Sequence, residues 1–226
     1  TSVEIGFWKV SGADNFHFDD VRLTRRSYAV KLENQHHWVI RNIETTGGSP
    51  FGIGVLNTIP DSDLEFIRII NCVAHDVAGV SDTDKSEGCI VIRPSAPGAR
   101  INDVIIDGCT AYNTKRWGGI IVFGAYSENR RSRNITIRNS TVYNVYGDGI
   151  LEACVVDAII ENCVSHDVGN MPENRMGTPN GIWQYFTDNG TVRNCEAYNT
   201  HSPQHDGGGF DIDILNKNCT VEYCYA

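Results

Sequence analysis

The sequence lacks several features that define common classes of protein. No uninterrupted apolar segment approaches the roughly 18–20 residues of a membrane-spanning helix, so we expect no membrane span. Basic residues are few: 19 Lys and Arg stand against 28 Asp and Glu, and the formal net charge of -9 argues against broad contact with nucleic acid. The 8 cysteines include no Cys-x-x-Cys pair, which disfavours a zinc site. Only 2 residues are Met whereas 22 are Gly, as in a β protein rich in turns.

The sequence does contain an internal repeat. One unit reads as alternating apolar residues, an Asn turn, a small residue, and then an aromatic or His residue followed by Asn or Asp. Its clearest copies are 67–76, 104–113, 135–144, 158–167 and 192–199. A second unit lies between these copies and begins at Gly52, Gly88, Gly119, Gly149, Gly181 and Gly209. Because a single coil cannot bury its apolar edge, short strands at this period predict a stacked solenoid.

Alignment of the repeat copies with one another predicts which side chains point inward. One inward column is Cys72, Cys109, Cys163, Cys195 and Cys224, which we expect to pack as small apolar residues. An outward column alternates in charge, as stacked side chains prefer, through Asp107, Arg138, Glu161, Arg193 and Glu222. A column of His75, Tyr112, Tyr143, His166 and Tyr198 is typical of stacked structural rings. The fold class is therefore all-β, a parallel β-helix of about six to seven coils.

The Asn-turn and Gly-Ile columns, between about Ser27 and Ala226, resemble the pectate-lyase-like superfamily of right-handed parallel β-helix proteins. Residues 1–26 lie outside the repeat and form a separate segment in our division of the chain, with the β-helix over 27–226. The segment from 3–8 through 18–23 resembles the last two strands of a carbohydrate-binding jelly-roll module, and the alternative is an N-terminal cap on the solenoid. Both ends interrupt strand patterns, so we expect a fragment of a longer chain with further domains.

Acidic and imidazole side chains gather in the last coil. The candidate catalytic residues are His201, His205, Asp206, Asp211 and Asp213. Asp211 and Asp213 are two residues apart on one strand, a backbone separation of about 6.5–7 Å that suits the carboxyl pair of a glycosidase. Alternatively Asp206, Asp211 and Asp213 bind Ca²⁺ through their oxygens, or the cluster is a solvated acidic turn.

The outward positions of the Gly-led strands carry apolar side chains. We expect Trp183 and Tyr185 to lie on the same face as Asp211 and Asp213, as a platform for a sugar ring. Burial of this apolar stripe under a long loop or a missing domain is the alternative. The loop residues Lys115, Arg116 and Trp117 are further candidates for substrate binding. Glu152 and Gln184 fall on inward positions of successive coils, which predicts a buried hydrogen-bonded pair.

The resemblance implies a secreted bacterial enzyme that degrades a polysaccharide as a lyase or a glycoside hydrolase. Its location would be extracellular, at the cell surface or periplasmic. Superfamily lyases often use Ca²⁺ and a base, for which Lys85, Lys115, Arg116, His201 and His205 are the candidates. Hydrolysis would use the aspartates instead. The alternative is a non-catalytic carbohydrate-binding, adhesive or structural β-helix segment of a larger protein, because this fold serves all of these functions.

Overall fold

The computed structural model describes residues 16–18, 22–24, 29–81, 84–175 and 177–226. Most of the segment 1–26, on which the jelly-roll resemblance rests, lies outside the described residues. Its two described strands pair in parallel with strands of the repeat. The described residues form 22 strands and no helix, so they include no helix that could cross a membrane.

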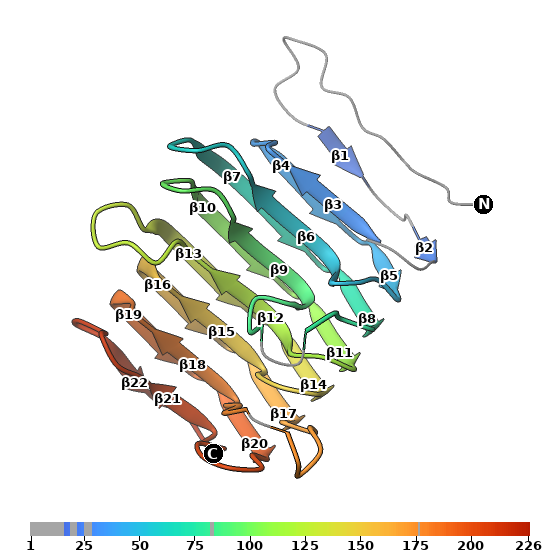
Figure 1. The fold of residues 1–226 in the computed structure, drawn as a ribbon, viewed down its shortest axis with the longest axis vertical. Coiled ribbons are helices and arrows are strands. Elements are labelled where there is room, and N and C mark those ends of the chain that lie inside the picture. Colours follow the sequence, from blue (N-terminus) through green and yellow to red (C-terminus); the bar gives the residue numbers. More distant parts are fainter. Residues whose placement is uncertain (1–15, 19–21, 25–28, 82–83, 176) are drawn as a thin grey trace.

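The strands form three parallel sheets that run side by side from one end of the molecule to the other (Figure 1). Sheet A contains β1 (Phe16–Phe18), β4 (Trp38–Arg41), β7 (Asp63–Ile70), β10 (Arg100–Asp107), β13 (Ser132–Arg138), β16 (Val155–Glu161), β19 (Asp188–Arg193) and β22 (Thr220–Glu222). Sheet B contains β2 (Arg22–Thr24), β5 (Glu44–Thr46), β8 (Val73–Val77), β11 (Thr110–Thr114), β14 (Thr141–Val145), β17 (Val164–Val168) and β20 (Glu196–Thr200). Sheet C contains β3 (Val30–Glu33), β6 (Phe51–Asn57), β9 (Gly88–Pro94), β12 (Gly118–Phe123), β15 (Ile150–Ala153), β18 (Ile182–Tyr185) and β21 (Phe210–Ile212). This arrangement confirms the predicted parallel β-helix.

Left-handed residues turn the chain from one sheet to the next. Between sheets A and B the turn residues Asn42, Asn71, Asn139, Asn162 and Asn194 have φ between 51° and 53°. Asn adopts this conformation at lower cost than most residues, which explains the Asn column of the repeat. A second set of turns after the aromatic column forms an amide ladder, in which Asn113 donates to Asp76 at 3.1 Å and Asn144 donates to Asn113 at 2.6 Å.

The interior of the solenoid is filled by the predicted columns. Cys72, Cys109, Cys163 and Cys195 are buried in it, and all eight cysteines of the chain are described and free of disulfides. Outside, successive rings of the His/Tyr column stack with centroids 4.7–5.3 Å apart and planes within 7°. The alternating charges pair between coils: Arg138 with Asp107 at 2.8 Å and Arg193 with Glu161 at 2.6 Å. These contacts confirm the register in sheets A and B.

In sheet C, one strand is shifted by one residue from the sequence alignment. The repeat aligns Gly88 with Gly119 as the first residue of the second unit. In the structure Gly88 pairs with Gly118, and Ile90 pairs with Ile120. Ile90 and Ile92 therefore point into the core, and Val91 is the outward residue of this strand. Because side chains alternate along a strand, the slip of one residue exchanged the two faces. The adjacent glycines 118 and 119 made either alignment possible.

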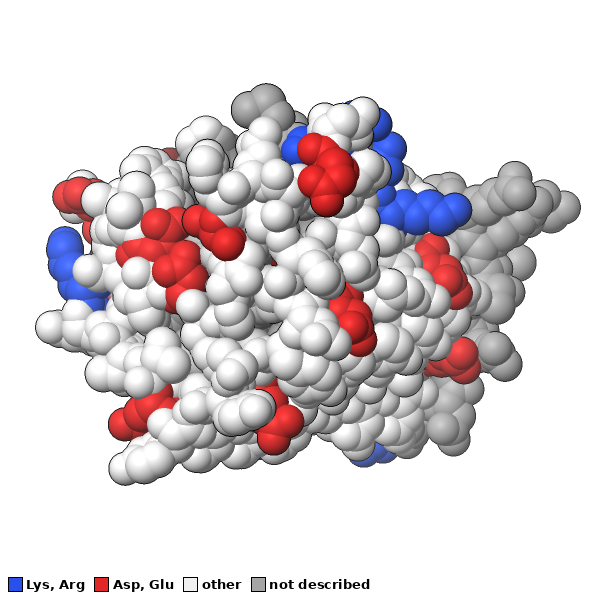
Figure 2. All heavy atoms as spheres, turned by 90° about the horizontal axis from the view of Figure 1, so that it is seen from below, with Lys and Arg blue, Asp and Glu red and all other residues white. Residues whose placement is uncertain are grey.

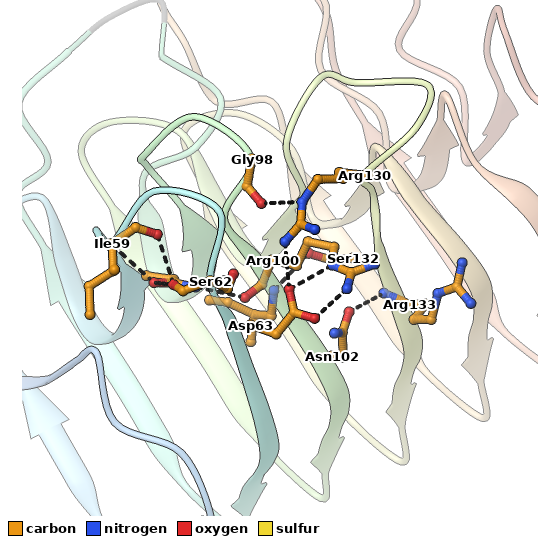
Figure 3. A network of polar contacts seen from close by, with 11 residues as sticks. Ile59, Ser62, Asp63, Gly98, Arg100, Asn102, Arg130, Ser132 and Arg133 are labelled. Atoms are coloured by element: carbon orange, nitrogen blue, oxygen red, sulfur yellow. Dashed lines mark hydrogen bonds and ion pairs between the residues drawn. The ribbon is translucent and has the colours of Figure 1, made fainter.

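The basic run near residue 130 has a structural role. Arg130 donates to the Gly98 carbonyl at 2.7 Å and pairs with Asp63 at 3.0 Å (Figure 3). Asp63 also pairs with Arg100, and these two guanidinium groups hold the pKa of the Asp63 carboxyl below its ordinary value. Arg131 is buried and donates to the Phe186 carbonyl at 3.0 Å. Two of the arginines are thus engaged within the protein rather than available for nucleic acid.

Candidate functional site

The outer face of sheet C carries two rows of side chains. The first row, by strand register, is Val91, Ile121, Leu151, Trp183 and Asp211. The second row runs through Phe123, Ala153 and Tyr185, and Asp213 follows directly after β21. Trp183 and Tyr185 therefore lie on the same face as Asp211, as the alternation of strand residues predicts.

The first row is covered rather than open to solvent. Val91, Ile121 and Leu151 are fully buried, and Trp183 is only 5% exposed. The ammonium of Lys85 lies 4.5 Å from the centroid of a Trp183 ring and 4.9 Å from that of Trp117. Burial under loops, the alternative reading of the apolar stripe, therefore describes this row, and the faces of Trp183 are not a free platform.

Trp117 is also buried. It is 2% exposed and packs with Tyr146 and Met171. Of its neighbours, the Arg116 guanidinium lies 5.7 Å from the Tyr146 ring centroid, and Lys115 is exposed.

A chain of polar contacts crosses the coils along this face. Lys85 Nζ lies 3.1 Å from Asp148 Oδ2 and donates to the Thr178 carbonyl at 2.7 Å. The Asn180 backbone N–H donates to Asp148 Oδ1 at 3.0 Å, and the Asn180 side-chain amide donates to Asp211 Oδ2 at 3.1 Å. The network thus connects the loop before β9 with loops before β15 and β18 and with strand β21.

Sequence reasoning missed Asp148 and Asn180 as parts of a site. Both are almost completely buried, although Asp and Asn usually mark exposed turns. Each immediately precedes the Gly that begins the second repeat unit, in successive coils. A polar residue repeated at that position was the available signal, because stacking places such residues next to each other.

Burial and neighbouring charges shift the pKa values of two carboxyl groups in the network. Burial raises the pKa of Asp148, and the Lys85 charge opposes that rise. Partial burial raises the pKa of Asp211, and the nearby carboxylates of Asp213 and Asp206 raise it further. The Asn180 hydrogen bond and the Lys85 charge pull the Asp211 pKa the other way. Asp211 is thus the carboxyl group on this face that holds a proton more readily than an ordinary Asp.

The three aspartates do not form a calcium cage as they are placed. Asp211 Oδ2 accepts the Asn180 amide, and Asp213 Oδ1 accepts the Ile214 backbone N–H at 2.6 Å. Within the described part of the chain, no three His, Cys, Asp or Glu side chains come together as metal ligands. Binding of Ca²⁺ by Asp206, Asp211 and Asp213 therefore stays a prediction from the sequence.

The two predicted histidines are exposed in the turn after β20. His201 lies near Asp167, whose pKa is lowered chiefly by the hydrogen bond from His166 and also by the charge of His201. The His205 carbonyl accepts the Ser202 hydroxyl, which closes the turn. Asp206 follows in a left-handed conformation with φ of 64°.

A groove of about 890 Å³ lies beside the second row of the outer face. Its lining includes Lys85, Arg93, Phe123 and Tyr126. Tyr126 is 66% exposed, and its ring centroid is 6.4 Å from that of Tyr185. Burial raises the pKa of Tyr185, and Tyr126 and Asp213 raise it further.

The molecular surface seen from below the view of Figure 1 carries several separate acidic patches, with a few basic side chains mainly towards its margins (Figure 2). On that face the described residues present no continuous basic strip that could follow a nucleic-acid backbone.

Comparison with known proteins agrees with the fold. The crystal structure of a GH136 lacto-N-biosidase from Eubacterium ramulus superposes with a TM-score of 0.67 at 19% sequence identity, covering 88% of this chain and 39% of that chain. The present chain thus spans about two fifths of that protein, and the likeness concerns the fold. No curated protein sequence matches the chain. The family model described as "Right handed beta helix region" matches residues 102–226, more than half of the chain. The chain therefore belongs to the right-handed β-helix family.

Proposed function

We propose that the outer face of sheet C binds a carbohydrate polymer and that Asp211 and Asp213 hydrolyse a glycosidic bond in it. The observation that carries this proposal is the position of Asp211: a partly buried carboxyl group next to Trp183 in the outer row of sheet C, with a pKa raised by burial and by the nearby carboxylates of Asp213 and Asp206. Glycosidases need one carboxyl group that is protonated at neutral pH and a second that is ionised.

In this reaction Asp211 donates its proton to the glycosidic oxygen while the bond between that oxygen and the anomeric carbon breaks. Asp213, or Asp206 from the preceding turn, supplies the second carboxylate. That group either takes a proton from an attacking water or bonds to the anomeric carbon. The separation of the two carboxyl groups in the substrate complex decides between inversion and retention.

The groove suits a sugar chain. Phe123 and Tyr126 offer ring surface to the apolar faces of sugar rings, and Arg93 offers hydrogen-bond donors to their oxygens. The named function of the similar structure, a lacto-N-biosidase, is also an activity on carbohydrate. The proposal includes an extracellular, cell-surface or periplasmic location.

Hydrolysis is better supported than β-elimination. Elimination needs a base at the acidic centre, and Lys85 already donates to Asp148 and to Thr178. The Arg116 guanidinium lies over the Tyr146 ring, and the Lys115 charge acts on Asp76. His201 and His205 lie in the exposed turn after β20, whereas Asp206, Asp211 and Asp213 are close enough together for the first and the last to raise the pKa of Asp211.

The proposal is tested by incubating the full chain with a panel of polysaccharides, with and without EDTA, while following reducing ends and the absorbance of unsaturated uronates. Reducing ends without the absorbance are expected. Asp211→Asn and Asp213→Asn should each reduce the rate at least a hundredfold, whereas Asp157→Asn, an exposed aspartate on sheet A, should not. An increase in absorbance would indicate a lyase. Binding without cleavage would favour the non-catalytic carbohydrate-binding alternative.

A further inference from the structure

Asn180 is buried at the junction of the polar network and the candidate acid. It is 1% exposed, and its backbone N–H and carbonyl are both used, by Asp148 Oδ1 at 3.0 Å and by the Gly149 N–H at 3.0 Å. Its side-chain oxygen accepts the Gly208 N–H at 3.0 Å, and its side-chain NH₂ donates to Asp211 Oδ2 at 3.1 Å.

The direction of the Asn180 amide is determined by these partners. The Gly208 N–H is a donor, so the acceptor end of the Asn180 side chain must face it. The NH₂ end then faces Asp211. Rotating the amide by 180° would place two donors against each other at Gly208 and two oxygens against each other at Asp211.

The backbone of Asn180 is itself held by an ion pair. Asp148 is fully buried, and an unpaired carboxylate there would be strongly unfavourable. Lys85 supplies its counter-charge and is anchored in turn by the Thr178 carbonyl and the rings of Trp117 and Trp183. Contacts from several coils therefore fix the position from which the amide reaches Asp211.

We propose that Asn180 is a positioning residue for Asp211, anchored by the Asp148–Lys85 pair, and that it engages Oδ2 so that Oδ1 is the oxygen presented to the substrate. The inference rests on the proposed function in that Asp211 is taken as the group that meets the glycosidic oxygen. The other groups that face Asp211 are Asp213 and Asp206, which are carboxylates and cannot supply this hydrogen bond when ionised, and Lys85, whose charge acts from a distance.

The test separates the two ends of the Asn180 side chain. Asn180→Asp keeps an oxygen for the Gly208 N–H but replaces the donor to Asp211 by a second oxygen. On the polysaccharide that the unmodified protein cleaves fastest, we expect kcat to fall at least tenfold and KM to stay within about twofold, while the melting temperature falls because the new carboxyl group is buried without a counter-charge. Asn170→Asp is the matched control, because Asn170 is an exposed asparagine of a neighbouring loop that ends the amide ladder, and its activity should be unchanged.

An Asn180→Asp variant with unchanged kcat would overturn the inference. If this variant fails to fold, Asn180→Ser makes the same test, because the shorter side chain cannot reach Asp211. If Asp211→Asn is itself fully active, the proposed function has failed, and a crystal structure of Asn180→Ala decides the inference without reference to activity. A rotated Asp211 side chain in that structure would support the positioning role, and an unmoved one would refute it.

Discussion

Inside the solenoid, Gln184 donates a side-chain hydrogen bond to Glu152 Oε2 at 2.8 Å, and both residues are completely buried. Glu152 on β15 and Gln184 on β18 are register partners in adjacent coils, so their side chains lie next to each other. Burial raises the pKa of Glu152 from its ordinary 4.5 to about 8, although the Gln184 hydrogen bond opposes the shift. Glu152 is therefore mostly a neutral acid at pH 7, which suits a carboxyl group surrounded by apolar side chains.

This pair predicts that stability depends on pH. The folded protein keeps the Glu152 proton up to about pH 8, whereas the unfolded chain releases it near pH 4.5. The stabilisation is thus complete below pH 4.5 and is lost as pH rises to about 8, with a slope of at most about 1.4 kcal/mol per pH unit. Urea unfolding at a series of pH values should show that Glu152→Gln flattens this slope. Glu173→Gln, at an exposed loop position, should leave the slope as it is.

The Lys85–Asp148 contact predicts that removing the lysine alone destabilises the protein more than replacing both residues. Lys85→Met leaves the buried Asp148 carboxyl without its counter-charge, so the free energy of unfolding should fall by about 3 kcal/mol. Adding Asp148→Asn should recover most of that loss, because the Asn oxygen still accepts the Asn180 N–H. Arg138→Met is the control: its pair with Asp107 is partly exposed and should contribute less than about 1 kcal/mol. Equal losses of unfolding free energy in Lys85→Met and Arg138→Met would contradict the structure.

At Asn139, two substitutions separate the contribution of the side-chain hydrogen bond from that of the left-handed backbone conformation. Asn139 has φ of 51° and donates to Asp107 Oδ1 at 2.8 Å. Asn139→Gly keeps the backbone conformation accessible and loses only the hydrogen bond, at about 0.5–1.5 kcal/mol. Asn139→Ala loses the bond and adds a left-handed strain of about 1–2 kcal/mol. Urea midpoints should therefore rank the unmodified protein above Gly and Gly above Ala. An Ala variant as stable as the Gly variant would show that the turn does not depend on the left-handed conformation.

Most of the fold could be predicted from the sequence because each coil repeats the same physical requirement. The inward Cys column, the Asn turns and the Glu152–Gln184 pair all follow from stacking one coil on the next. The register of β9 was wrong where two consecutive glycines offered no side chain to mark the face.

The candidate site was only partly predictable for a different reason. Loops of unequal length have no repeat to align, so the sequence offered burial of the apolar stripe under a long loop only as an alternative and did not indicate that the loops carrying Lys85 and Thr178 cover Trp183. Asp211 and Asp213 were found because the alternation of residues 210–213 could be read, although strand β21 itself ends at Ile212. Asp148 and Asn180 were missed because their partners come from other coils.

The groove predicts where binding energy for a sugar chain resides. Tyr126 lines the groove and is 66% exposed, so Tyr126→Ala should remove ring surface without disturbing the core. We expect the Kd for an oligosaccharide of the cleaved polymer to rise about tenfold, which corresponds to about 1.4 kcal/mol. Tyr225→Ala is the matched control, because Tyr225 is 71% exposed and its backbone forms a β-bridge with Glu196 of sheet B, away from the groove. Isothermal titration calorimetry on inactive Asp211→Asn protein measures both constants without turnover. Equal affinities for the two tyrosine variants would place the binding surface elsewhere on the β-helix.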